Sequence, residues 1–295
     1  MTLAIFAHLA QKAYWTYLLR SLATCLRRSR RRCPCCGARS YDVVARKLAV
    51  TALVRCHACR LLYRIPTDPP GLGESLYQQN YTAGFYSDIP PREKLQELIA
   101  TKFAGSKRDH ADYIRVLRAL GVAAGARVLE LGASWGYGTW QLSQAGYETL
   151  GFEPGKARAR IAGELLGVHV EDDLNKIGGP FDVLFSAHVL EHFSNPRDAF
   201  ALAARFVKPG GLFVAFIPNG GLERMRVTPE YHADWGMYHP VYLDHVFFRN
   251  AFPDTPLVLT TRPYGLERLR AWNRRESLVF DLIGAELLFV RAVGH

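Results

Sequence analysis

The chain has 295 residues, 49% of them hydrophobic and 22% charged, which excludes a disordered protein and allows one large α/β domain with about 100 residues beside it. The formal net charge is +10, but residues 1–70 hold 13 Lys and Arg against two Asp and carry +11, which leaves −1 for the rest. Such a basic segment can meet phosphate, nucleic acid or anionic lipid, and its charge alone does not distinguish them.

The first expected element is an amphipathic helix over residues 3–26. Its polar face repeats every four positions, at His8, Lys12, Thr16 and Arg20. A membrane span is disfavoured because Lys12 at the bilayer centre would cost about 3 kcal/mol, and a signal peptide because the positive charge follows the apolar run. With the arginines in 27–32, this helix could lie on an anionic membrane surface. The alternative is a helix packed on its own protein.

Two Cys-x-x-Cys pairs follow, separated by 19 residues. Their members are Cys33, Cys36, Cys56 and Cys59. This spacing is typical of a zinc ribbon, in which each tight turn points two thiolates at one ion and the segment between them forms a small hairpin sheet. Four protein ligands leave no open position, so we expect a structural Zn²⁺, with two disulfides or a metal-free site as alternatives. Without a secretory signal we expect a reducing, cytoplasmic location; Cys25 and Cys35 are not expected to bind metal.

A segment rich in Pro, Gly and Tyr covers residues 66–91 and is expected to be an ordered linker. From residue 91 to 120 the apolar residues return at three- and four-residue spacing, which predicts two helices broken near Gly105.

The stretch RVLELGASWGYGT, residues 127–139, predicts a buried strand that runs into a glycine-rich turn and a helix. Ser134 stands where a dinucleotide fingerprint has its middle glycine. Glu130 enters the turn, and Gly132 and Gly136 leave room for a close backbone approach. The loop therefore suits a ligand with an ammonium and an adenosine, S-adenosylmethionine, rather than a diphosphate. The alternative is a turn that needs glycine only for its backbone angles.

Acids follow the next two expected strands. Glu153 ends the strand 149–152 and lies where it could accept hydrogen bonds from both hydroxyls of an adenosine ribose. After a third strand at 168–170 come Glu171, Asp172 and Asp173. We favour Asp173 for the adenine amino group; the alternative is that these acids only face solvent.

A fourth strand is expected at 181–186 and a fifth at 212–217. The segments LELGASWGYGT, GFEP, FDVLFSAHVLEHFSNP and VKPGGLFVAFIPN then resemble, in order and phase, the motifs of class I S-adenosylmethionine-dependent methyltransferases. CPCCG and RCHACRLLYRIP resemble the zinc-ribbon front end of a subgroup of these enzymes, many of which modify sugars, polysaccharides or natural products.

The resemblance implies an α/β, Rossmann-like sheet of seven strands, with 256–261 and 286–293 as the last two and the final strand antiparallel. It also implies that Gly132 and Gly136 approach the cofactor, Glu153 holds the ribose, Asp173 faces adenine and His188 lies beside the cofactor. Ser134 departs from the commoner glycine. No Asn/Asp-Pro-Pro-aromatic tetrad follows the fourth strand, which counts against an exocyclic nitrogen of a nucleobase as acceptor.

The expected organisation has four parts: residues 1–32 as a basic helix, 33–66 as the zinc ribbon, 67–109 as a linker and helical region, and 110–295 as the methyltransferase domain. A substrate insertion is expected at about 219–252. It is dense in side chains that can hold a sugar-like or aromatic acceptor: Tyr231, His232, Asp234, Trp235, Tyr238, His239, Tyr242, Asp244 and His245. The alternative is that these aromatics only cover the sheet edge.

A hydroxyl acceptor must lose a proton, and histidine is the side chain whose reference pKa suits a base at neutral pH. The candidates are His188, His192, His239 and His245. We favour His239, which lies in the aromatic insertion and precedes Pro240, a residue that restricts the backbone before it. His188 is the rival, but it directly follows the fourth strand, where the alternative role is contact with the cofactor.

The sequence therefore predicts an O-methyltransferase for a small-molecule or carbohydrate acceptor. An RNA methyltransferase that grips phosphates with its basic ribbon is one alternative. A non-catalytic scaffold that binds S-adenosylmethionine is another. The oligomeric state stays open.

Overall fold

The computed structural model describes residues 15, 17–19, 21–25, 27–47, 50–68, 89–228, 235–236 and 239–294. The polar positions expected for the N-terminal helix, most of the tyrosine-rich linker and part of the insertion lie outside these residues: His8, Lys12, Thr16, Arg20, residues 69–88, Tyr231, His232, Asp234 and Tyr238. The chain forms two compact units. Unit 1 comprises residues 1–73, 191–198 and 218–253; unit 2 comprises 74–190, 199–217 and 254–295.

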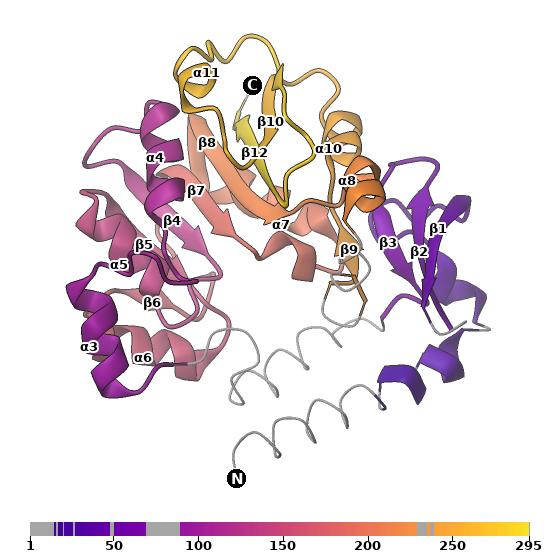
Figure 1. Cartoon of the computed structure of the whole chain (residues 1–295), viewed down its shortest axis with the longest axis horizontal. Helices are drawn as coiled ribbons and strands as arrows, with labels where there is room; N and C mark the ends of the chain where they lie inside the picture. Colours follow the sequence, from indigo (N-terminus) through magenta and orange to yellow (C-terminus); the bar gives the residue numbers. More distant parts are fainter. Residues whose placement is uncertain are drawn as a thin grey trace. The chain divides into compact units, whose positions relative to one another are not determined.

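Unit 2 is built on an eight-stranded sheet of order β11-β10-β12-β8-β7-β4-β5-β6 (Figure 1). Its strands are β4 (Arg127–Leu131), β5 (Glu148–Phe152), β6 (Val170–Glu171), β7 (Phe181–Ala187), β8 (Val207–Pro218), β10 (Leu257–Thr261), β11 (Leu278–Val279) and β12 (Glu286–Ala292). The α/β class and the antiparallel pairing of β12 with β10 are confirmed. The expected count of seven strands is wrong, because β11 adds a two-residue strand parallel to β10 that is too short to show a periodic pattern.

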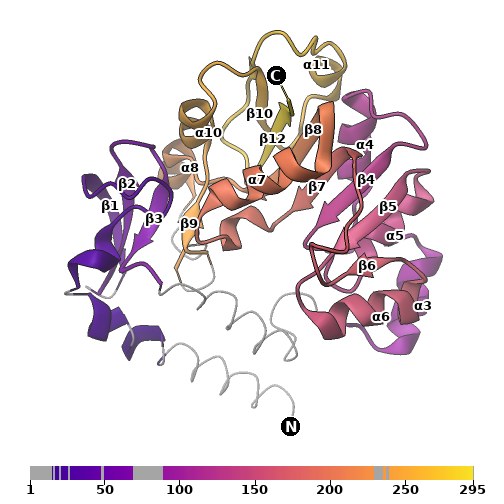
Figure 2. The ribbon, with the colours of Figure 1, turned by 180° about the vertical axis from the view of Figure 1, so that it is seen from behind.

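The helices of unit 2 lie before, between and after its strands. They are α3 (Arg92–Ala100), α4 (Ala111–Ala119), α5 (Tyr137–Gln144), α6 (Lys156–Leu166), most of α7 (Pro196–Phe206) and α11 (Leu266–Arg270). The short η3 (Leu190–His192) precedes α7, and residues 191–198 belong to unit 1. The helix α7 starts where the sequence places Pro at its first position, and the Asn195 side chain accepts a hydrogen bond from the Arg197 amide. Figure 1 shows α4 in front of the strands, and Figure 2, seen from behind, shows α7 in front of them.

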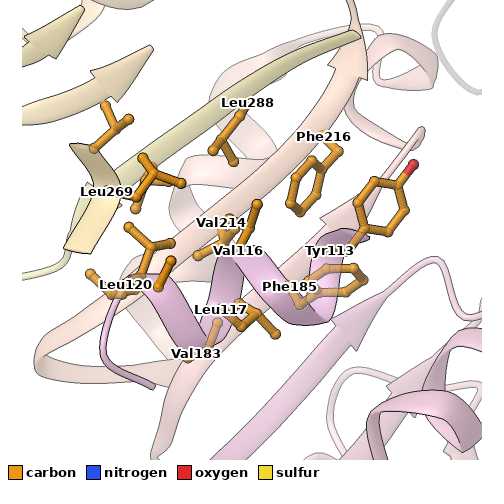
Figure 3. Close-up of a cluster of buried hydrophobic side chains, with 14 of the residues drawn as sticks. Tyr113, Val116, Leu117, Leu120, Val183, Phe185, Val214, Phe216, Leu269 and Leu288 are labelled. Carbon is orange, nitrogen blue, oxygen red and sulfur yellow. The ribbon is translucent and has the colours of Figure 1, made fainter. Parts of the chain in front are cut away.

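The apolar core of unit 2 explains this layering. One side of α4 packs on the sheet through Tyr113, Val116 and Leu117, which contact inward side chains of β7 and β8 such as Phe185 and Phe216 (Figure 3). On the opposite face, Phe200 of α7 contacts Phe213 and Phe289. Because helices cover both faces of the sheet and successive side chains of a strand point to opposite faces, the central strands are mostly apolar.

Unit 1 contains a four-stranded antiparallel sheet of order β1-β2-β3-β9 (Figure 2). Its strands are β1 (Tyr41–Lys47), β2 (Thr51–Cys56), β3 (Leu62–Ile65) and β9 (Val241–Tyr242), and its helices are η1 (Arg28–Arg31), α8 (Leu222–Val227) and α10 (His245–Ala251). Three strands come from the cysteine-containing segment and the fourth from the insertion, which pairs Tyr242 with Leu62 and Val241 with Tyr63. The insertion is therefore part of the same sheet as the strands between and after the two cysteine pairs.

Candidate functional site

The loop between β4 and α5 has an unusual backbone. Gly132, Ser134 and Gly136 all have left-handed backbone angles, with φ of 77°, 53° and 84°. A Cβ at Gly132 would collide with the side chain of Val189, and one at Gly136 would lie 2.8 Å from both Ala162 and Val168. Glycine is therefore required at both positions by backbone angle and by space.

Glu153 fixes this loop from the end of the neighbouring strand β5. Its side chain is fully buried, and its two carboxylate oxygens accept hydrogen bonds from the Ser134 amide at 3.0 Å and the Gly155 amide at 2.8 Å. A carboxylate has about four acceptor positions. Glu153 thus ties the ends of β4 and β5 together.

Arg158 of α6 holds the loop through Ser134, a role that the sequence analysis missed. It lies on α6, is buried, and donates a hydrogen bond of 2.8 Å from Nη1 to the Ser134 hydroxyl. The serine that replaces the expected middle glycine is therefore held by a specific partner. In the run KARARIA the sequence does not distinguish Arg158 from an exposed arginine; only its position on the inner side of the helix does.

Glu130 lies at the base of the loop and is buried. Its carboxylate accepts a hydrogen bond from the Thr139 hydroxyl at the start of α5, and the Nε2 atom of His110 lies 3.7 Å away. A Cβ at Gly138 would meet the same carboxylate. In this structure Glu130 therefore joins β4 to the first turn of α5.

Asp173, the residue favoured for adenine, lies two positions after β6 and is half-buried. One of its carboxylate oxygens accepts a hydrogen bond of 2.9 Å from the Asn175 amide, which closes a turn. The next strand in the sheet, β5, carries Glu153 at its end. The two acids thus follow adjacent strands, as the sequence analysis expected.

His188 directly follows β7 and has a left-handed backbone, with φ of 55°. Such an angle is uncommon outside glycine and is seen mostly in turns and functional loops. Its Nε2 atom lies 2.7 Å from Oε2 of Glu286, the first residue of β12. The phenols of Tyr113 and Tyr264 donate to the same carboxylate. Glu286 is 98 residues from His188 in the chain, and no local pattern could have paired them.

The charges in this group favour an ionised Glu286. Burial raises the pKa of this carboxyl, but the hydrogen bond and charge of His188, with contributions from Tyr264 and Arg262, outweigh it and lower the pKa to about 2. Burial and the nearby carboxylate raise the pKa of both Tyr113 and Tyr264, so the phenols stay protonated donors. His188 thus faces a permanently charged carboxylate.

In unit 1 the four predicted cysteines converge. The sulfur atoms of Cys33, Cys36, Cys56 and Cys59 all lie within 4.8 Å of one another. Sγ of Cys33 is 3.4 Å from that of Cys59, and the Cys36 and Cys56 sulfurs are 3.5 Å apart. Hydrogen bonds from Cys33 and from the neighbouring Cys35 lower the pKa of the Cys59 thiol.

A second group in unit 1 was only partly foreseen. Glu191 and His192 of η3 and His239 of the insertion each place one ligand atom within 4.8 Å of the others. Glu191 is buried, the histidines are half-buried, and the two imidazole rings have centroids 4.9 Å apart. Two of the expected base candidates are thus brought together with a carboxylate that the sequence analysis did not name. His245 begins α10 and is not a member of this group.

Residues of the insertion contact each of the strands β1, β2 and β3. Lys47 of β1 donates to the Trp235 carbonyl and lies over its ring, 4.2 Å from the centroid. Arg55 of β2 forms a buried ion pair of 2.6 Å with Asp244, which also caps α10 by accepting from the Phe247 amide. These contacts and the β3–β9 pairing hold the segment that carries His239.

Comparison with protein families gives one match over more than half of the chain. A family model described as a methyltransferase domain matches residues 94–252. Two curated proteins named ubiquinone biosynthesis O-methyltransferase are similar over a shorter stretch. The one from Nitrosococcus oceani is 32% identical over 110 residues, which is 34% of this chain and 45% of that protein. The one from Maricaulis maris is 27% identical over 109 residues, 32% and 41% of the two chains. The matched region thus spans less than half of either relative.

Among solved structures, similarity extends over more of the chain at low identity. A plantazolicin methyltransferase in complex with a substrate analogue and SAH gives a TM-score of 0.49 at 10% identity, covering 73% of this chain and 94% of that one. A TehB-like SAM-dependent methyltransferase from Corynebacterium glutamicum gives 0.45 at 19% identity, covering 74% and 98%.

Proposed function

The chain belongs to the family of this methyltransferase domain, and from that premise we propose that it transfers a methyl group from S-adenosylmethionine to an oxygen atom of a small-molecule or carbohydrate acceptor. The observation that carries the proposal is the loop of Gly132, Ser134 and Gly136, held by the buried carboxylate of Glu153. The names of the two curated relatives, both O-methyltransferases, support oxygen as the acceptor atom.

The residues around this loop fit the cofactor. Gly132 can adopt its left-handed backbone against the side chain of Val189 only because it lacks a Cβ, and this shapes the turn that would meet the cofactor. Glu153 would accept the ribose hydroxyls, and Asp173 would face the adenine amino group. Glu130 and Ser134 would act by shaping the loop, through Thr139 and Arg158 respectively. His188, which follows β7, would lie beside the methionine portion.

When bound, S-adenosylmethionine supplies a methyl group on a sulfonium, whose carbon–sulfur bond breaks with the electron pair left on sulfur. The acceptor oxygen forms the new bond to that carbon, and most of the catalysis is correct orientation. The hydroxyl proton must leave, and we propose that the group containing His239 promotes its loss. His188, with Glu286 fixing its ring, is the second candidate.

We also propose that the four cysteines bind one structural zinc ion. Sulfurs bound at about 2.3 Å in a tetrahedron lie about 3.8 Å apart, and the observed separations of 3.4 and 3.5 Å, with every pair within 4.8 Å, fit that arrangement. Zinc would fix the turns on either side of β1 and β2. With four thiolates it would have no open position for catalysis.

A membrane surface is a second proposed contact. Trp15, Leu19 and Leu22 are exposed and lie four and three residues apart in a stretch where residues 17–19 and 21–24 are helical. Among the described residues, no helix is long and apolar enough to cross a membrane. Co-sedimentation with anionic vesicles should fall when Leu19 and Leu22 are changed to Ser; equal binding by that variant would contradict the proposal.

The function is tested with methyl-labelled cofactor and separate glycan, sugar-nucleotide, lipid and RNA fractions. Label in the glycan, sugar-nucleotide or lipid fraction supports the proposal. Label in RNA, with affinity that falls steeply with salt, favours the nucleic-acid alternative. Cofactor binding without product in any fraction favours a scaffold.

Gly132→Val is the matching test of the cofactor site. The valine side chain would occupy the space of Val189 and force a branched residue into a left-handed backbone, so calorimetric titration should detect no S-adenosylmethionine binding. Gly125→Ala is the control, because Gly125 has the same backbone angle, φ 78°, but open space around it. Wild-type affinity in Gly132→Val would contradict the assignment.

A further inference from the structure

Glu191, His192 and His239 form a set of potential metal ligands that differs in kind from the four cysteines. It offers two imidazoles and one carboxylate, with ligand atoms within 4.8 Å of one another. Three atoms bound to one ion at about 2.0–2.2 Å, spread evenly around it, are about 3.3–3.8 Å apart. From separations of at most 4.8 Å, the described ligand atoms therefore need to close by about 1–1.5 Å at most.

The position of His239 is fixed by backbone contacts on both sides. Its carbonyl accepts a hydrogen bond of 3.2 Å from the Gly236 amide, and the carbonyl of the following Pro240 accepts one of 2.9 Å from the Arg64 amide. Val241, next in the chain, pairs with Tyr63 of β3. A histidine placed in this way loses little conformational freedom when it binds a ligand.

The electrostatic setting also suits a cation. The Glu191 side chain is about 1% exposed, and ionised carboxylates are costly to bury unless a positive charge compensates them. Two adjacent imidazoles, with ring centroids 4.9 Å apart, are poor partners for each other when both are protonated but are ordinary ligands of one ion when neutral.

We propose that Glu191, His192 and His239 bind a divalent transition-metal ion. Two histidines and a carboxylate are the donor set of catalytic zinc and non-haem iron sites, and three protein ligands leave open coordination positions. An acceptor hydroxyl bound at an open position would be acidified and would release its proton to water, as metal-bound water does. This last step rests on the proposed function. It gives His239 the role of a ligand, since a ring nitrogen bound to a metal cannot also take up a proton.

The site is tested first by binding, without cofactor or acceptor. The full chain, isolated with zinc on its cysteines and kept reduced, is titrated with Co²⁺, which has distinct spectra for sulfur and for nitrogen and oxygen ligands. Wild type should take up one further equivalent without sulfur-to-cobalt charge-transfer bands. Glu191→Gln and His239→Ala should bind at least about tenfold more weakly, a loss already typical for altered outer-shell partners.

His169→Ala is the matched control, because His169 pairs with Glu171 at 2.9 Å on the exposed surface of unit 2. It should bind Co²⁺ like wild type. Circular dichroism identifies a variant that fails to fold. If His239→Ala fails to fold, the Co²⁺ affinity of Glu191→Gln, which keeps the side-chain size, decides whether the site exists. No further uptake by wild type at millimolar Co²⁺, or full uptake by Glu191→Gln, would overturn the proposal.

Failure of the site and failure of the function have separate results. Methylation by a chain that binds no second metal leaves the function in place and removes the site. Co²⁺ uptake lost in Glu191→Gln, together with no methylation of any acceptor, leaves the site and removes the function.

Discussion

The two units of this protein are encoded differently. Unit 2 follows a regular succession of strands and helices, and the residues that shape its loop between β4 and α5 lie close together in the chain. Unit 1 is assembled from three segments, residues 1–73, 191–198 and 218–253, and its side-chain groups join residues about 190 positions apart. The alternating strand and helix pattern therefore predicts the sheet of unit 2. The part expected to meet the acceptor depends instead on pairs of residues far apart in the chain, such as Arg55 and Asp244, which no local pattern reveals.

The largest expected effect comes from removing zinc from unit 1. Cys59→Ser should lose the metal and unfold the β1–β3 hairpins, because structural zinc contributes about 10–16 kcal/mol of apparent binding free energy in small domains. Elemental analysis and hydrogen exchange of residues 33–66 measure this. If the two units are energetically separate, affinity for S-adenosylmethionine should stay within a few-fold.

Cys25→Ser is the control, since Cys25 lies outside the four-sulfur group and should retain zinc. Metal-free wild type under reducing conditions, or an unchanged fold in Cys59→Ser, would refute the zinc proposal.

The next effect tests how the insertion is attached. Arg55→Ala should destabilise unit 1 by about 3–5 kcal/mol, because it leaves the buried charge of Asp244 without its guanidinium. Denaturant unfolding, followed by the fluorescence of Trp235, gives the free energy. Replacing both partners together, with Arg55→Met and Asp244→Leu, should cost less than the single change. A loss below about 1 kcal/mol for Arg55→Ala would mean that the pair is solvated.

In unit 2 the equivalent test is Glu286→Gln. The folded-state pKa of Glu286 is about 2 against an ordinary 4.5, so its ionised form stabilises the fold above pH 4.5, and this contribution, about 3 kcal/mol, is lost as the pH falls from 4.5 towards 2. The difference in unfolding free energy between wild type and Glu286→Gln should therefore be largest near neutral pH and shrink in acid. The groups that face Glu286 are His188, Tyr113, Tyr264 and Arg262. A difference that does not vary between pH 7 and 3 would contradict an ionised Glu286 in the folded protein.

The smallest effect is expected at the ribose. Glu153→Ala should weaken S-adenosylmethionine binding by about 2 kcal/mol, or about 30-fold, the scale of hydrogen bonds to a charged group. Calorimetry measures it, and Glu148→Ala, an exposed residue at the start of the same strand, is the control. Equal loss in both variants would indicate a general effect on β5.

The sequence was sufficient for the parts of the molecule that are governed by short-range patterns. Apolar runs bounded by glycine placed the main strands of unit 2, and the family match confirms the enzyme class. Cys-x-x-Cys turns predicted four sulfurs that do converge. Glu153 could be singled out because an acid at the end of a strand is recognisable from the order of the elements, and its role at the ribose stays a prediction.

What the sequence did not reveal depends on distance along the chain or on very short elements. The additional strand β11 and the strand β9 have two residues each, too few to show any periodicity. Arg158 resembles the exposed basic residues beside it, and Glu286 and Glu191 gain meaning only from His188 and His239, which the fold brings to them. These are charged groups in buried places, which composition and spacing do not mark.

The pairing of β3 with β9 has a consequence for how the protein is made. Leu62 pairs with Tyr242, which lies 180 positions later in the chain. At about 5–20 residues per second, the edge of β3 waits about 10–40 s for its neighbouring strand after leaving the ribosome. During that interval its amide and carbonyl groups are open to any other strand, including β3 of a second nascent chain. Between translation of the cysteines and translation of the insertion, β3 thus presents an unpaired edge to intermolecular strand pairing.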